Sequence, residues 1–141
     1  MARGGHSSNW ATTDAICGYL IGPLLAQHPA LIGEITRWSR HQNMWVRRAA
    51  AVGLVRSARK GVALNEAYAL ARALHADHED LIQKAVGWLL RETGKTDRAR
   101  LQRYLRRHGR SIPRTTLRYA IERFDEPTRR ELLRITSSRQ P

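Results

Sequence analysis

The sequence has 141 residues and a formal net charge of +13, from 25 Lys and Arg against 12 Asp and Glu. A chain of this length suits one compact domain with its own core. A hydrophobic content of 42% with 26% charged residues is typical of a globular protein. Cys17 is the single cysteine, which excludes an intrachain disulfide and a zinc site built on a cysteine pair. We therefore predict one domain over residues 1–141, with disorder in 1–8 and a tail over 137–141.

Positive charge is concentrated toward the C-terminus. Residues 91–141 contain 15 Lys and Arg against 6 Asp and Glu, so +9 of the +13 lies there, and most of it is arginine. The planar guanidinium of arginine suits phosphate. The charge predicts binding to a polyanion, although a merely solvated basic surface would have the same composition. No apolar run approaches the length of a membrane span, and MARGGHSSN lacks a signal core, so we expect a reducing, cytosolic location.

Helical periodicity runs through the chain, and strand signals are nearly absent. Asn43 is expected to cap a helix and Pro113 to open one, while Gly61, Gly94 and Gly109 mark helix ends. The pattern predicts about eight helices, over residues 9–27, 29–40, 43–59, 64–76, 79–93, 97–108, 113–124 and 126–136.

Pairs of these predicted helices recur about every 35 residues, the length of one helical hairpin in a solenoid. Stacked hairpins form an extended concave surface, although an ordinary bundle could show similar spacing by chance. Several glycines fall inside the predicted helices at roughly 1 kcal/mol each relative to Ala. Close helix packing or close approach of a ligand backbone would explain Gly18, Gly22, Gly33, Gly53 and Gly87.

Trp10 and Asp14 are four residues apart and share one face of the first predicted helix. That face continues through small or apolar residues, where a buried carboxylate is costly unless it has a function. Alternatively, Asp14 lies in the first turns of the helix, where an acid is favoured by the macrodipole.

Arg48 is surrounded by apolar residues in a helix that is apolar nearly all round, so its guanidinium needs a partner or must reach an edge. A phosphate, a carboxylate or an internal salt bridge would serve. Lys84, Trp88 and Arg91 share a face of the fifth predicted helix, and an aromatic plane between two cations suits base stacking and phosphate binding. A lone tryptophan at helical spacing is otherwise a core residue.

The run from His75 to Asp80 contains several potential metal ligands. It falls at a predicted turn and has no second ligand cluster, so we predict no metal site. The sequence has no glycine-rich phosphate loop, no Ser/His/Asp pattern and no Walker motif. We therefore expect no cofactor.

Four ordered stretches carry a resemblance to a known family: WATTD at 10–14, NMWVRRAA at 43–50, IQKAVGWLLRETGK at 82–95 and IPRTTLRYAIERF at 112–124. From about residue 8 to 135 the chain resembles the DNA alkylation repair family of AlkD-like glycosylases. The resemblance implies a right-handed solenoid of HEAT-like hairpins with a concave basic face. It also implies a bacterial cytosolic or nucleoid protein whose partner is duplex DNA containing alkylated purines.

The resemblance also implies roles for individual residues. Trp10 and Trp88 would face the lesion, Asp14 would be the catalytic carboxylate, and Arg48 would lie in the cleft beside it. The expected contacts with the DNA backbone are those of Arg47, Lys84, Arg91 and the arginine-rich sixth and seventh predicted helices, especially Arg114 and Arg118.

The expected activity is hydrolysis of the N-glycosidic bond of N3- and N7-alkylated purines. A non-catalytic HEAT-like module that binds nucleic acid is the alternative, and a protein-binding solenoid is a third possibility. Relatives carry further helical repeats before the Trp-x-x-x-Asp segment, whereas nine residues precede Trp10 here. We therefore expect an N-terminally short solenoid whose exposed first helix pair could self-associate.

Overall fold

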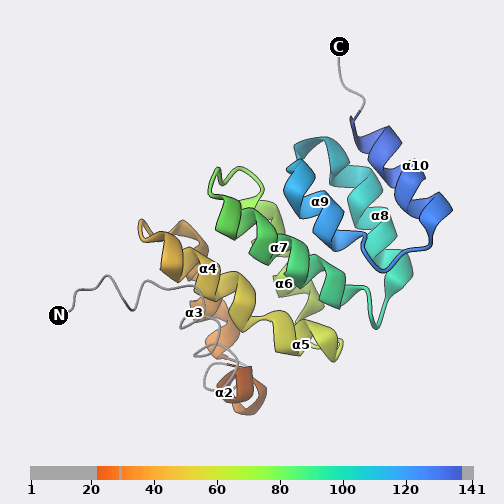
Figure 1. The fold of residues 1–141 in the computed structure, drawn as a ribbon. Helices are drawn as coiled ribbons and strands as arrows, with labels where there is room; N and C mark the ends of the chain where they lie inside the picture. Colours follow the sequence, from red (N-terminus) through yellow and green to blue (C-terminus); the bar gives the residue numbers. More distant parts are fainter. Residues whose placement is uncertain (1–21, 29, 138–141) are drawn as a thin grey trace.

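The computed structural model describes residues 22–28 and 30–137, and regular structure there is helical throughout (Figure 1). This confirms the all-α prediction. None of the helices in that part of the chain is long and apolar enough to cross a membrane. The α-helices are α2 (Gly22–Gln27), α3 (Leu31–Arg37), α4 (Met44–Gly53), α5 (Val55–Arg59), α6 (Leu64–Leu74), α7 (Asp80–Thr93), α8 (Arg98–His108), α9 (Arg114–Ala120) and α10 (Glu126–Ser137).

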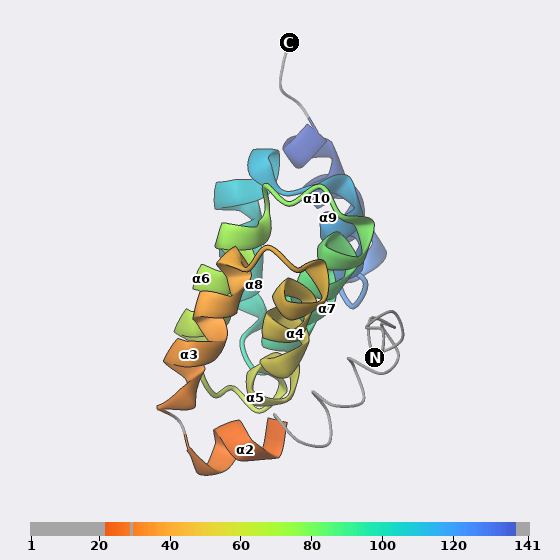
Figure 2. The same ribbon diagram turned by 90° about the vertical axis from the view of Figure 1, so that its left-hand side faces the viewer.

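The helices form two rows (Figure 2). Helices α4, α7 and α9 lie side by side in one row, and α3, α6 and α8 lie in the other. Helix α7 is central, because it packs against α4, α5, α6 and α9. Helix α10 closes the C-terminal end against α8. This stacking of hairpins is consistent with the predicted solenoid.

Several helix ends follow the predicted local chemistry. The Asn43 side chain accepts a hydrogen bond from the Trp45 backbone N–H at 2.8 Å, as an N-cap does. The Asp97 side chain caps α8 in the same way through the Arg100 N–H at 3.0 Å. Gly61 has a φ of +78°, in the left-handed region that favours glycine.

Two predicted helices are shorter than the sequence pattern indicates. The helix predicted over 43–59 is interrupted at Leu54, whose N–H bonds to the Ala51 carbonyl at 3.3 Å instead of continuing the α-helical ladder. Gly53, which has low helix propensity, lies directly before the break. The helix predicted over 113–124 ends at Ala120, and turns follow. The predicted helix over 9–27 lies mostly outside the described residues.

Branched and aliphatic side chains fill the space between the two rows. Burying a side chain of this size stabilises a fold by about 1.5–3 kcal/mol. The largest of these fully buried residues include Leu54, Leu70, Ile82, Leu89, Leu90, Leu105, Leu117, Ile121 and Leu132.

Gly87 sets the spacing between α7 and α9. A Cβ atom at this position would lie 2.4 Å from the Cβ of Tyr119 and 2.8 Å from the Thr116 carbonyl oxygen. The Thr116 hydroxyl also donates to the Gln83 carbonyl at 2.8 Å, which fastens α9 to the preceding turn of α7. Close helix packing therefore explains Gly87. It does not explain Gly33, around which a Cβ would meet nothing within 4 Å.

His75 is a buried histidine between α6 and α8. Its Nε2 lies 2.7 Å from the Tyr104 hydroxyl. Burial, followed by the nearby positive charges of His108 and Arg72, lowers the pKa of His75 to about 4. The imidazole is therefore neutral at physiological pH.

The two helical glycines give a matched pair of substitutions. Gly87→Ala should lower the free energy of unfolding by about 2 kcal/mol, because the backbone of α9 has no room to accept the methyl group. Gly33→Ala should raise it by about 0.5–1 kcal/mol, because the new methyl meets open space and alanine is the better helix former. Urea unfolding of both variants checks the pair, and equal effects would contradict the α7–α9 contact.

Stability should also depend on the protonation of His75. The unfolded chain binds a proton at its imidazole near pH 6.5, whereas the native protein does so only near pH 4. The free energy of unfolding should therefore fall as the pH falls below 6.5, by up to about 1.4 kcal/mol per pH unit. His75→Gln keeps a partner for Tyr104 without the titration, so denaturation of this variant between pH 7 and 5 should show a shallower slope. An unchanged slope would assign the dependence to other groups.

Candidate nucleic-acid interface

One face of α7 lines an open pocket with a volume of about 360 Å³. Lys84, Trp88 and Arg91 line it together with Leu81, at the spacing that places residues on one side of a helix. Helix α4 contributes Arg48, and α9 contributes Tyr119. We call this pocket the aromatic cleft. The structure thus brings together four of the predicted site residues.

The aromatic wall of the cleft consists of Trp88 and Tyr119. Trp88 is partly buried and packs against the core along one side, which leaves the rest of the indole to line the cleft. Tyr119 is 38% exposed. Tyr119 was not among the site residues predicted from the sequence. Its position opposite Gly87 depends on the packing of α9 on α7, which no local motif reveals.

Arg48 lies at the buried end of the cleft and is only 6% exposed. Its Nη1 donates to the Leu81 carbonyl at 2.6 Å, which connects α4 to the first turn of α7. The backbone carbonyl was not among the predicted partners of this guanidinium. This hydrogen bond to α7, a helix of the neighbouring hairpin, holds the Arg48 guanidinium in place.

The cations at the rim are paired with carboxylates. Lys84 Nζ lies 3.0 Å from Asp80 Oδ2, and this hydrogen bond raises the pKa of Lys84. Arg91 forms an ion pair with Glu122 from the turn after α9. Ion pairs of this exposed kind are weak in water, so a phosphate can replace the carboxylate.

The remaining predicted backbone contacts differ in how their side chains are held. Arg47 is 17% exposed and binds Asp77 Oδ2 at 2.7 Å and two carbonyls, of His41 and Gln42, at 2.9 Å. The guanidinium of Arg47 therefore joins two loops of the protein itself, and its contact with DNA stays a prediction.

Arg114 and Arg118 both belong to α9 but face different surroundings. Arg114 donates to the Thr136 hydroxyl at 3.2 Å and to the Leu133 carbonyl at 3.3 Å, which fastens α9 to α10. Arg118 is exposed. Trp10 and Asp14, the other predicted site residues, lie outside the described residues.

The described helices and an aromatic cleft rimmed by cations are compatible with the class of helical nucleic-acid-binding proteins. Residues 4–124 match the family described as DNA alkylation repair enzyme. The chain therefore belongs to this family, which gives it a role in DNA repair and DNA as its partner. No curated protein gives a significant match.

Truncation of Arg118 should affect DNA binding, whereas truncation of Arg114 should affect stability. Arg118→Ala should reduce the slope of log K against log salt concentration by about one unit, since one phosphate contact is lost. Arg114→Ala should lower the free energy of unfolding by about 1 kcal/mol through loss of its bonds to α10. Titrations of a fluorescent duplex at several salt concentrations and denaturant unfolding measure the two effects. An unchanged slope for Arg118→Ala removes this residue from the interface.

Proposed function

We propose that the protein is a DNA glycosylase that hydrolyses the N-glycosidic bond of positively charged N3- and N7-alkylated purines in duplex DNA. The observation that carries the proposal is the aromatic cleft, in which Trp88 lies between Lys84 and Arg91 on one face of α7. Membership of a DNA alkylation repair family supports the same substrate class.

The cleft suits a cationic base held in a polyanion. The face of an indole attracts positive charge, so Trp88 favours an alkylated purine over an uncharged one by cation–π contact. Lys84 and Arg91 would repel such a base if they faced it. At the rim, with Asp80 and Glu122 as their present partners, they are instead placed to exchange carboxylate for backbone phosphate.

Asp14 is the proposed catalytic carboxylate and Trp10 the second aromatic residue at the lesion. When the C1′–N bond breaks, its electron pair goes to the purine, which leaves as a neutral base. Positive charge grows on the deoxyribose, where a carboxylate stabilises it. Water then bonds to C1′ and loses a proton, for which Asp14 is the base.

The alkylated purine is a good leaving group, so a general acid is not needed. Arg48 is the proposed cleft residue beside the lesion. Because its guanidinium is anchored to the Leu81 carbonyl, it presents a fixed positive charge suited to a phosphate flanking the damaged nucleotide. No step of the proposed reaction uses a cofactor or a metal ion.

The first experiment is release of free methylated purines from methylated duplex DNA. The parent protein should release them, and Asp14→Asn should abolish release while undamaged duplex is still bound. Glu126→Gln is the matched control, because it removes one negative charge from an exposed site on α10. Its release should equal that of the parent.

Equal release by Asp14→Asn and the parent would sink the catalytic role of Asp14. DNA binding by the folded parent without any release would indicate a non-catalytic HEAT-like module. Failure to bind duplex at low salt would favour a protein-binding solenoid.

A further inference from the structure

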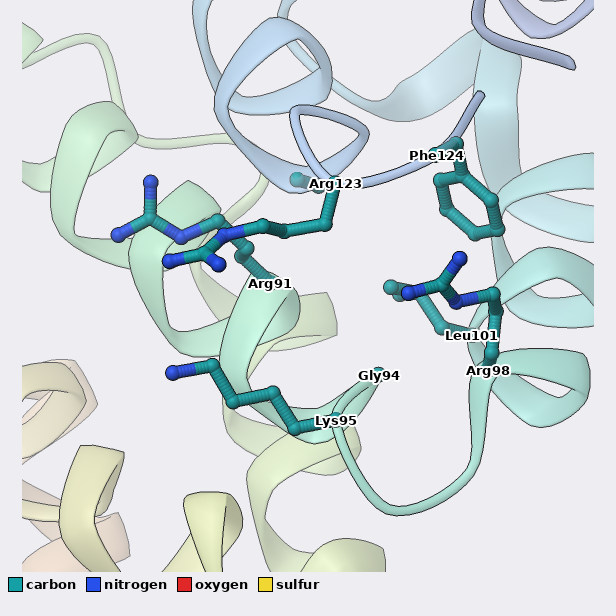
Figure 3. Close-up of a pocket in the computed structure, with 8 residues that line it drawn as sticks. Arg91, Gly94, Lys95, Arg98, Leu101, Arg123 and Phe124 are labelled. Carbon is teal, nitrogen blue, oxygen red and sulfur yellow. The ribbon is translucent and has the colours of Figure 1, made fainter.

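A second pocket, of about 160 Å³, shares Arg91 with the aromatic cleft. Figure 3 shows residues that line it. It forms where the C-terminal end of α7 meets the start of α8 and the turn after α9. Four of its lining residues are basic, namely Arg91, Lys95, Arg98 and Arg123, and Leu101 and Phe124 supply apolar surface. We call it the basic pocket. Arg98 and Arg123 lie in the sixth and seventh predicted helices, whose arginines we expected to contact the DNA backbone, although only Arg91 among the four cations was singled out.

Carboxylates balance two of the four cations. Arg91 pairs with Glu122, and Lys95 Nζ lies 2.8 Å from Glu92 Oε1. Glu92 is also bound by Arg59 at 2.9 Å, and its side chain is 2% exposed. Burial alone would raise the pKa of Glu92, but the hydrogen bonds from Lys95 and Arg59 outweigh burial and lower it. Glu92 is therefore ionised and is shared among several cations.

No carboxylate balances the positive charges of Arg98 and Arg123 in the described part of the chain. Neither side chain forms an ion pair or hydrogen bond within residues 22–28 and 30–137. The guanidinium carbon of Arg98 lies 5.5 Å from the centroid of the Phe124 ring, which holds the group against apolar surface. Arg91 Nε is buried and makes no hydrogen bond in the described part of the chain, although it lies 3.6 Å from Glu92 Oε2.

The side chains are arranged around one space. In Figure 3 Arg91, Arg123 and Lys95 extend in the same direction, and Arg98 lies beside Phe124 at the other end of the pocket. Like charges held together next to apolar surface repel one another, and this repulsion is relieved when an anion binds between them. Guanidinium groups suit a phosphate in particular, because their planar N–H donors match its oxygen atoms.

We propose that the basic pocket binds a phosphodiester group of the DNA strand that occupies the aromatic cleft, with Arg98 and Arg123 as its main contacts. The two pockets share Arg91, so an anionic chain lying in one reaches the other. The inference rests on the proposed function in that DNA lies in the aromatic cleft.

A strand of DNA fits the pocket better than a free phosphate ion. At the N-terminus of α8 the Asp97 carboxylate accepts from the Arg100 N–H, and its negative charge disfavours a small anion at this helix end. A free ion would depend on exposed arginine contacts, which are weak singly in water. A polymer gains from all its phosphate contacts together.

The test compares Arg98→Gln/Arg123→Gln with Arg56→Gln/Arg134→Gln in duplex binding over a range of salt concentrations. The control removes the same charge from exposed positions of α5 and α10 outside the basic pocket. The pocket variant should lower the slope of log K against log salt by about one to two units, whereas the control keeps the parent slope. Arg98→Lys/Arg123→Lys restores the charges and should recover most of the slope. Equal slopes for the parent and the pocket variant would overturn the proposal.

A second arm distinguishes DNA from free phosphate. Inorganic phosphate is titrated into the parent, and the backbone amide signals of residues 94–98 and 120–124 are followed by NMR. Saturable binding of phosphate there, with an unchanged duplex slope in the pocket variant, would assign the pocket to the free ion and overturn the proposal. Base release is a separate readout. If the pocket variant has a reduced slope but the parent releases no base, the proposal for the basic pocket stands and the proposed glycosylase activity is rejected.

Discussion

The close contact between α7 and α9 is the constraint on which the rest of the interface depends. It exists because Gly87 presents no side chain to the backbone of α9. Trp88, the next residue of α7, lines the cleft beside this contact, and Tyr119 from α9 completes the aromatic wall. A larger residue at position 87 would move α9 outward and separate the two halves of the cleft. The geometry of the interface therefore depends first on the absence of a side chain at Gly87, and only then on its charged residues.

The same packing places carboxylates beside the cations of the interface in the free protein. Asp80, Glu92 and Glu122 each lie within ion-pair distance of cations at or beside the two pockets. These acids keep a strongly basic chain from repelling itself where its cations are closest together. Exposed pairs such as Lys84–Asp80 cost little to open, whereas Glu92 is buried and stays with its partners. Binding of a polyanion therefore replaces some of the internal partners and leaves others intact.

Local chemistry was readable from the sequence where it depends on near neighbours. The cap at Asn43, the left-handed Gly61 and the shared face of Lys84, Trp88 and Arg91 all follow from spacing of a few residues. The break at Leu54 was missed because apolar residues continue through it without interruption.

Contacts between residues that are far apart in the sequence could not be predicted from local spacing. The partner of Arg47 is Asp77, 30 residues away, so the loop-joining role of this arginine appears only in the fold. Arg98 and Arg123 come from different hairpins and line one pocket only because α8 and the turn after α9 converge. The family resemblance supplied roles for Trp10 and Asp14 that no described contact yet tests.

The bond from Arg48 to the Leu81 carbonyl has a mechanical consequence. It spans 33 residues and acts as a cross-brace between neighbouring hairpins, at the point where a groove between them would otherwise open or close. A groove held in this way has a fixed width, so the molecule that binds in it has to adjust its own shape. Under the proposed function the other molecule is duplex DNA, so the duplex is the partner expected to bend.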